Sequence, residues 1–221
     1  MAIASGLRIG AVVALAAWVA SAPAVTAAES AGGDGSAPVV YHYSVRGKGH
    51  VSDIEEFAAA TAETYADPRG WNLGGSVRFE RIASGGDFTL WLSADGQMST
   101  FGGACDVVWS CRSGDNVVIN EDRWLGASPA WNESGASLRD YRHMVVNHET
   151  GHWLGFGHAT CASPGAPAAA MQQQSMGLQR CAPNPWPLAG ERAAAGRRLP
   201  APLLTDRERD AIRRDTGNIL L

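Results

Sequence analysis

Residues 148–158 read HETGHWLGFGH, and this stretch decides how the rest of the chain is interpreted. His148 and His152 are four residues apart, so on a helix they project from nearly the same face, one turn apart. Gly155 lets the chain leave the helix and turn back, because it has no Cβ, and the turn returns His158 to the other two histidines. Three imidazole nitrogens can bind one Zn²⁺ at roughly 2.0–2.1 Å each. The stretch therefore predicts a zinc site with His148, His152 and His158 as ligands.

Glu149 is placed to act on such a site without joining it. It lies one step around the helix from His148, within reach of a metal-bound water molecule. A three-histidine site with one open position and a nearby carboxylate is typical of hydrolytic zinc centres. We expect Glu149 to be the general base that takes a proton from the metal-activated water. The alternative is a zinc-binding module without hydrolytic activity, although a structural site has no use for a carboxylate beside an open position.

The helix that carries this site has its own start and stop signals. Ser137 followed by Asp140 resembles a capping box. Apolar residues then recur at helical spacing as far as Val145. The sequence predicts a helix from Leu138 to Gly155, so the two histidines lie on a defined element.

Length and charge limit the classes of protein to consider. The 221 residues suffice for one domain with a sizeable core. The net charge is −4 and there is no basic block, so neither nucleic acid nor an anionic membrane is expected as a partner. We expect three parts: a signal peptide over 1–27, a flexible linker over 28–38 and one domain over 39–221.

The N-terminal segment has the features of an export signal. Arg8 precedes an apolar run over 9–20, and small-residue cleavage sites follow at 22–24 and 25–27. The run is short for a membrane span, so we expect a cleaved signal peptide and a secreted protein. An uncleaved membrane anchor is the alternative.

Four cysteines in an exported chain predict two disulfides. Of the three possible pairings, Cys105–Cys111 with Cys161–Cys181 is favoured, because each pair is local and lies on one side of the zinc motif. A structural metal site is the competing interpretation, but the chain has no C-x-x-C pair.

The remaining elements are expected from residue patterns. Strands are predicted over 39–45, 77–82, 88–92, 98–103 and 117–120. A helix is predicted from Ser52, which Glu55 follows as in a capping box, to Pro68. We expect a loop over 124–133 and a last helix from Thr205 to Asp215.

Residues 98–103 are interpreted as an edge strand with a role in binding. An edge strand has free N–H and C=O groups with which an extended peptide can pair. We therefore expect Ser99, Thr100, Phe101 and Gly102 to contact a substrate backbone.

At the level of its motif the chain resembles the metzincin clan of zinc endopeptidases. The matching residues are the three histidines, Glu149 and Gly155, with a methionine further along the chain. In that clan a tight turn that carries a methionine packs beneath the metal. The resemblance implies that Met171 occupies this turn, with Met176 as the alternative. No tyrosine follows Met171, so the tyrosine ligand of some members of the clan is absent.

The resemblance also implies a fold of the α+β class, as in zincins. That fold has a twisted, mostly parallel five-stranded sheet with an antiparallel edge strand, an N-terminal helix, the active-site helix and a C-terminal helix. More closely, residues 148–158, 172–175 and 183–187 look like a family of secreted actinobacterial metzincin-like proteins of unassigned function, over about residues 38–215. This closer resemblance implies an actinobacterial origin and a metzincin-like fold, but it supplies no substrate. From the site motif and the export signal we expect a secreted zinc endopeptidase that acts on a peptide or protein substrate, and we expect it to be a monomer.

Overall fold

The computed structural model describes Met1 and residues 37–103 and 105–198, and within these ranges five strands form one sheet. The strands are β1 (Val39–Lys48), β2 (Val77–Arg81), β3 (Phe88–Ser93), β4 (Cys111–Ser113) and β5 (Asn116–Asn120). Their order is β2-β1-β3-β5-β4. All neighbours are parallel except β4, which runs antiparallel to β5 at the edge. The expected mixed sheet with an antiparallel edge strand is therefore confirmed.

Helices connect and cover the strands. They are α1 (Ile54–Ala66), α2 (Glu121–Gly126), α3 (Pro129–Glu133), α4 (Leu138–Trp153) and α5 (Ala189–Arg198), with short 3₁₀ helices η1 (Leu73–Gly75) and η2 (Asp95–Phe101). The Ser137 side chain accepts the N–H of Asp140 and caps α4 as predicted. At α1 the cap is Asp53 rather than Ser52, because the Asp53 carboxylate accepts the N–H groups of Glu55 and Glu56.

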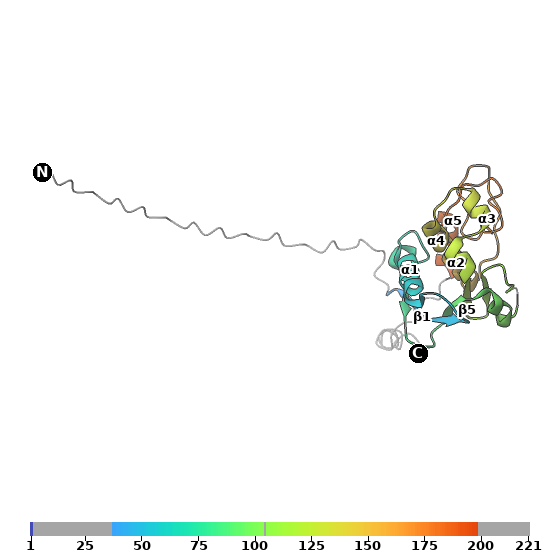
Figure 1. Ribbon diagram of the computed structural model, residues 1–221. Helices are drawn as coiled ribbons and strands as arrows, with labels where there is room; N and C mark the ends of the chain where they lie inside the picture. The colour runs from blue at the N-terminus through green and yellow to red at the C-terminus, as the bar shows by residue number, and fades with distance from the viewer. Residues whose placement is uncertain (2–36, 104, 199–221) are drawn as a thin grey trace, which may run out of the picture. The chain divides into compact units, whose positions relative to one another are not determined.

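The two faces of the sheet are covered by different parts of the chain. On one face, α1 and α4 pack on a core that contains Leu90, Val117 and Ile119 (Figure 1). On the other face, Val118 packs with Met98 of η2 and with the two cysteines of the first disulfide. β5 is buried from both sides, which explains its unbroken apolar run.

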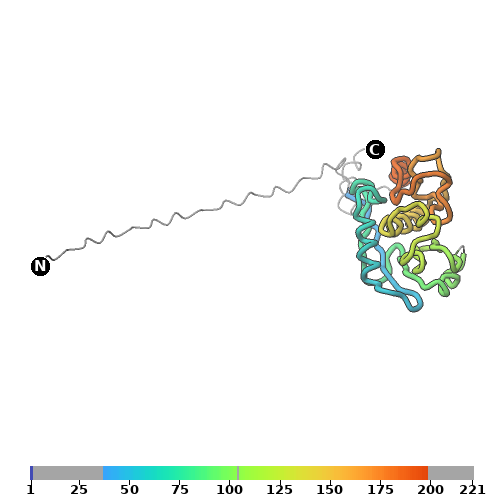
Figure 2. The backbone as a smooth tube through the Cα atoms, turned by 45° about the horizontal axis from the view of Figure 1, so that its top comes forward, coloured from blue at the N-terminus to red at the C-terminus, as the bar shows by residue number. Residues whose placement is uncertain are grey.

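α4 separates the sheet from the C-terminal part of the structure. Figure 2 shows α4 in yellow, with the green segment that precedes it on one side and the orange segment that follows it on the other. Trp71, Ala170 and Met171 form a second buried cluster against the end of this helix. The site helix is thus held from two directions.

Two predicted elements differ in the structure. Residues 98–103 are not a strand, because η2 curls them so that Met98 is buried, and the edge strand is β4 instead. The segment 124–133 is not a loop but contributes to α2 and α3, whose caps are Asn120 and Ser128. The helix predicted over 205–215 lies outside the described residues, as does the expected signal peptide apart from Met1.

Both predicted disulfides are present, one joining Cys105 to Cys111 and the other Cys161 to Cys181. Such bonds are typical of proteins in oxidising environments. Among the described residues, no helix has the length and apolar character needed to span a membrane.

Candidate metal centre

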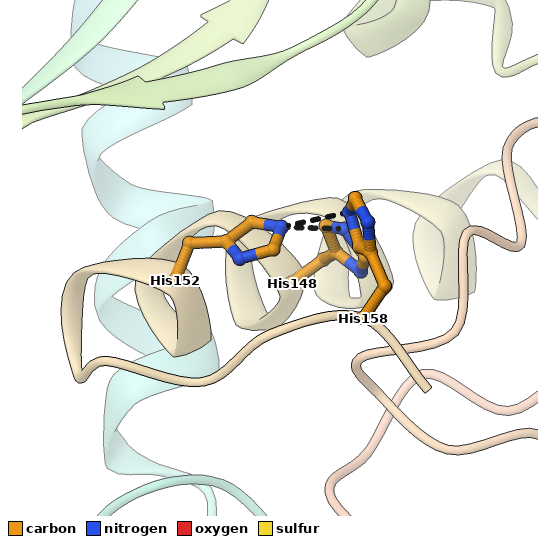
Figure 3. Close-up of side chains that lie close together, drawn as sticks. All are labelled: His148, His152 and His158. Carbon is orange, nitrogen blue, oxygen red and sulfur yellow. Dashed lines mark hydrogen bonds between the residues drawn. The ribbon is translucent and has the colours of Figure 1, made fainter. Parts of the chain in front are cut away.

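Three histidines converge at the C-terminal end of α4. The Nε2 atom of His152 lies 3.2 Å from that of His148 and 3.1 Å from that of His158 (Figure 3). His148 and His152 come from successive turns of the helix. Gly155, with φ of 87°, turns the chain so that His158 reaches the same point from outside the helix. The structure therefore brings together the three predicted ligands.

Backbone carbonyls set the orientation of two of these rings. His148 donates from Nδ1 to the carbonyl of Ala170 over 2.8 Å, and His152 donates from Nδ1 to the carbonyl of Phe156 over 2.8 Å. A carbonyl can only accept, so both Nδ1 atoms carry the proton and both Nε2 atoms present a lone pair. Such hydrogen bonds from the far ring nitrogen are usual for metal-binding histidines.

The donor set fits a metal ion. Two Nε2 lone pairs that face each other repel, unless a cation lies between them. Four-coordinate zinc with Zn–N bonds of 2.0–2.1 Å places its nitrogen ligands about 3.3 Å apart, close to the spacing found here. His148, His152 and His158 can therefore hold one metal ion.

Burial keeps the His148 and His152 imidazoles in the neutral form that binds metals. Removal from water lowers the pKa of His148 to about 3, and the nearby His152 adds to the effect. Burial is also the main cause that lowers the pKa of His152. Near neutral pH neither ring has to lose a proton before it binds a metal.

Glu149 is buried beside the histidines. The residue is 4 % exposed. Burial raises the pKa of Glu149 to about 8. The carboxyl therefore holds a proton more tightly than an exposed glutamate does, and a bound cation would lower this pKa again.

The centre opens into a cleft of about 680 Å³. One wall comes from the loop that follows Cys105 and from β4, including Asp106, Trp109 and Arg112. α4 and the turn after it form the floor, and residues 173–176 form the other wall. The cleft is large enough for several residues of a peptide.

The wall over residues 173–176 is fixed by hydrogen bonds. Gln174 donates from Nε2 to the carbonyls of Ala169 and Asn184 and accepts the N–H of Asn184. Tyr141 of α4 forms a hydrogen bond with Ser175 through their hydroxyl groups, over 2.9 Å. These contacts tie the wall to the helix that carries the metal ligands.

Of the two candidate methionines, Met171 lies beneath the centre. It is 1 % exposed, and a Cβ at Gly151 of α4 would lie only 2.3 Å from its Sδ atom. Met176 is 58 % exposed and lines the cleft. The packing therefore agrees with Met171 as the methionine under the histidines.

The predicted substrate-binding stretch does not reach the cleft. Ser99, Thr100, Phe101 and Gly102 do not line it, because η2 covers the opposite face of the sheet from α4. Asp106 and residues 109–112 line this side of the cleft instead. Asp106, Trp109 and Ser110 lie between Cys105 and Cys111, and that position is the sequence signal that could have found them.

Comparison with known proteins gives a family but no activity. The model of the family described as "Protein of unknown function (DUF3152)" matches residues 24–184. The match covers most of the chain and includes the three histidines, so the chain belongs to this family. No curated protein matches the chain.

Proposed function

We propose that this member of the DUF3152 family is a zinc-dependent endopeptidase of the metzincin type that acts outside the cell. One observation carries the proposal. Three imidazoles converge through Nε2 at the floor of an open cleft, and the buried residue Glu149 lines the same cleft. A structural metal site would not need either the cleft or the carboxyl.

Zinc is the metal that this donor set favours. Three histidine nitrogens with no protein carboxylate among them match the ligand sets of hydrolytic zinc sites, although imidazoles also suit copper, iron and nickel. When bound, zinc would polarise a carbonyl oxygen and acidify a water molecule. The three ligands come from α4 and from the turn that follows it, so they are positioned before any substrate arrives.

In this proposal Glu149 moves the proton. One of its carboxylate oxygens accepts a proton from the attacking water and then donates it to the leaving amine. A bound cation would lower the pKa of Glu149 from the value that burial raises, so that the carboxyl can lose its own proton and then accept one from the water. The apolar side chains of Met144 and Val145 line the cleft next to it and limit the access of other water molecules.

A peptide is the substrate that the cleft fits best. β4 forms the outer edge of the sheet, so its free side can pair with an extended backbone. Cys111 and Arg112 of this strand line the cleft. In this proposal the edge strand that aligns the substrate is residues 111–113, and not residues 98–103 as expected from the sequence.

Two further features support the metzincin type and the location. Met171 packs beneath α4 at Gly151, where the resemblance puts the methionine of the tight turn. The two disulfides agree with an oxidising compartment, as does the signal peptide expected from the sequence.

The test is cleavage by the chain without residues 1–27. The purified protein is given zinc and a library of quenched fluorescent peptides, with and without a chelator, and its metal content is measured. We expect about one zinc per chain, cleavage that stops with the chelator, and cleavage that returns when zinc is added. Glu149→Ala should keep the zinc and lose the cleavage.

Glu133→Gln is the matched control, because Glu133 is an exposed glutamate of α3 outside the cleft. It should cleave as wild type does. Full activity of Glu149→Ala would contradict the proposed role of the carboxyl. A protein that binds zinc but cleaves none of the peptides would instead favour the zinc-binding module.

A further inference from the structure

We propose that Glu191 positions His148 and strengthens its bond to the metal, acting through the peptide group that joins Ala170 to Met171. Glu191 lies on α5, beyond the residues that the family model matches. It does not line the cleft, so it is a positioning residue rather than a catalytic one. The metal part of this inference rests on the proposed function, whereas the orientation of His148 does not.

The Glu191 carboxylate accepts three backbone N–H groups. Its Oε1 atom accepts the N–H of Met171 over 2.9 Å, and its Oε2 atom accepts the N–H of Ala170 over 3.0 Å. Oε2 also accepts the N–H of Leu188 over 2.7 Å, which caps the start of α5. Hydrogen bonds to a carboxylate are stronger than those between neutral groups. One side chain therefore joins α5 to the segment beneath the histidines.

A single peptide group transmits this interaction to His148. The N–H of Met171 and the carbonyl of Ala170 belong to the same amide. The N–H donates to Glu191, and the carbonyl accepts the Nδ1 proton of His148 over 2.8 Å. A hydrogen bond at one end of an amide polarises the group and strengthens the bond at the other end. The Glu191 carboxylate thus acts on the His148 imidazole through the peptide group between them, and it makes Nε2 of His148 a better electron donor.

The same segment contacts the other ligand-bearing parts of the site. The carbonyl of Met171 accepts the N–H of Ala159, the residue after His158, over 2.9 Å. The Met171 side chain packs on Gly151, between the two ligands on α4. Ala170 and Met171 are 0 % and 1 % exposed, so water cannot replace these contacts without a local rearrangement. By holding residues 170–171 in place, Glu191 stabilises the segment that contacts the chain at or next to each of the three ligands.

The metal-binding test compares Glu191→Ala and Glu191→Gln with wild type. Zinc dissociation constants are measured by competition with a chromophoric chelator. Loss of a group that orients a metal ligand typically weakens metal binding by about 10- to 100-fold, and we expect this range for Glu191→Ala. Glu191→Gln should also weaken binding, because its amide retains only one of the two accepting oxygens.

The matched control is Asp53→Ala. Asp53 also caps a helix by accepting two backbone N–H groups, those of Glu55 and Glu56, but it lies at the start of α1. The control should lose stability and leave the zinc dissociation constant unchanged. Equal weakening of zinc binding in Asp53→Ala would mean that general loss of stability, and not the peptide relay, explains the effect.

A second readout works without metal. In the metal-free protein, ¹H–¹⁵N correlation spectra of the histidine rings report which nitrogen carries the proton. We expect His148 to be protonated at Nδ1 in wild type, and Nε2 protonation to increase in both Glu191 variants. His152 is an internal control, because its Nδ1 donates to Phe156 instead and should not change.

These measurements separate the two proposals. If wild type binds no zinc, the proposed function fails, and the ring spectra alone decide the role of Glu191. If Glu191→Ala does not fold, the role of Glu191 is judged from Glu191→Gln, which keeps the shape of the side chain. A zinc dissociation constant and a His148 tautomer that both match wild type in a folded Glu191 variant would overturn the inference.

Discussion

Gly151→Ala should destabilise the protein, although the same change stabilises most helices. Gly151 lies inside α4, where alanine is normally favoured over glycine by about 1 kcal/mol. Here the added Cβ would lie 2.3 Å from Met171 Sδ and 3.1 Å from Trp71 Cζ2. Trp71 has little freedom to move, because it donates from Nε1 to the carbonyl of Asn147 over 2.9 Å. The methyl group therefore has no room without a shift of the buried methionine.

The size of the effect follows from two opposing terms. Forcing an extra methyl group into a packed core costs about 1–3 kcal/mol. Subtracting the gain in helix propensity, about 1 kcal/mol, leaves a net loss of about 0–2 kcal/mol for Gly151→Ala. Met171→Ala alone should cost about 2–5 kcal/mol, because it leaves a cavity. In the double variant the new methyl group occupies part of that cavity.

The assay is a double-mutant cycle with Gly151→Ala, Met171→Ala and both together. Free energies of unfolding are measured in urea with a chelator present, so that metal binding does not contribute. The double variant should be more stable than the sum of the single effects predicts, by about 1–3 kcal/mol. Gly196→Ala in α5 is the control, because a Cβ there meets nothing within 4 Å, and it should be neutral or stabilising.

Simple additivity in this cycle would refute the reasoning, as would a Gly151→Ala protein more stable than wild type. Either result would mean that Met171 does not pack on α4 at Gly151.

Two further predictions concern pH and the disulfides. Burial raises the pKa of Glu149 from its ordinary 4.5 to about 8, so the folded protein holds this proton more tightly than the unfolded chain does. The contribution of Glu149 to the free energy of unfolding is therefore greatest below pH 4.5 and is lost as the pH rises through 8. In the metal-free protein, Tm measured across this range should therefore fall less with rising pH for Glu149→Gln than for wild type; parallel profiles would show that burial does not shift this group. Replacing Cys161 and Cys181 by serine should lower the free energy of unfolding in urea by about 3 kcal/mol, and replacing Cys105 and Cys111 by about 2 kcal/mol. The loops they close span 20 and 6 residues, and a larger loss from the shorter loop would contradict this entropic account.

The metal ligands could be predicted because their geometry is local. His148 and His152 share a helix face through their spacing alone, and Ser137 and Gly155 mark where that helix begins and where the chain turns. The disulfide pairing was predictable for a similar reason, because each pair closes a short stretch of chain.

Residues 98–103 were predicted wrongly because small polar residues suit both an edge strand and a tight turn. The structure closes turns here through hydrogen bonds from Thr100 Oγ1 to the carbonyl of Gln97 and from the N–H of Gly102 to the carbonyl of Ser99. These bonds curl the chain and bury Met98 against Val118 on the face of the sheet away from α4. Nothing in the local pattern indicates which face needs that side chain.

The start positions of α2 and α3 could have been predicted from their capping residues. Asn120 and Ser128 both precede short helices, and Pro129 follows Ser128 at the first helical position, where proline is favoured. Glu191 is a different case. Its role depends on a carbonyl of Ala170 that points at His148, and no local spacing reveals the direction of a distant carbonyl.

The three ligands lie within eleven residues, so bringing them together closes only a very short loop. The contact from His148 to Ala170 spans 22 residues, and that from Ala170 to Glu191 spans another 21. Loop-closure entropy rises with each such span, by about 0.6 kcal/mol for each doubling of length. The ligands are thus assembled by short-range contacts and supported by long-range ones. A substitution or truncation near the C-terminus can therefore alter how the ion is held while every ligand stays intact.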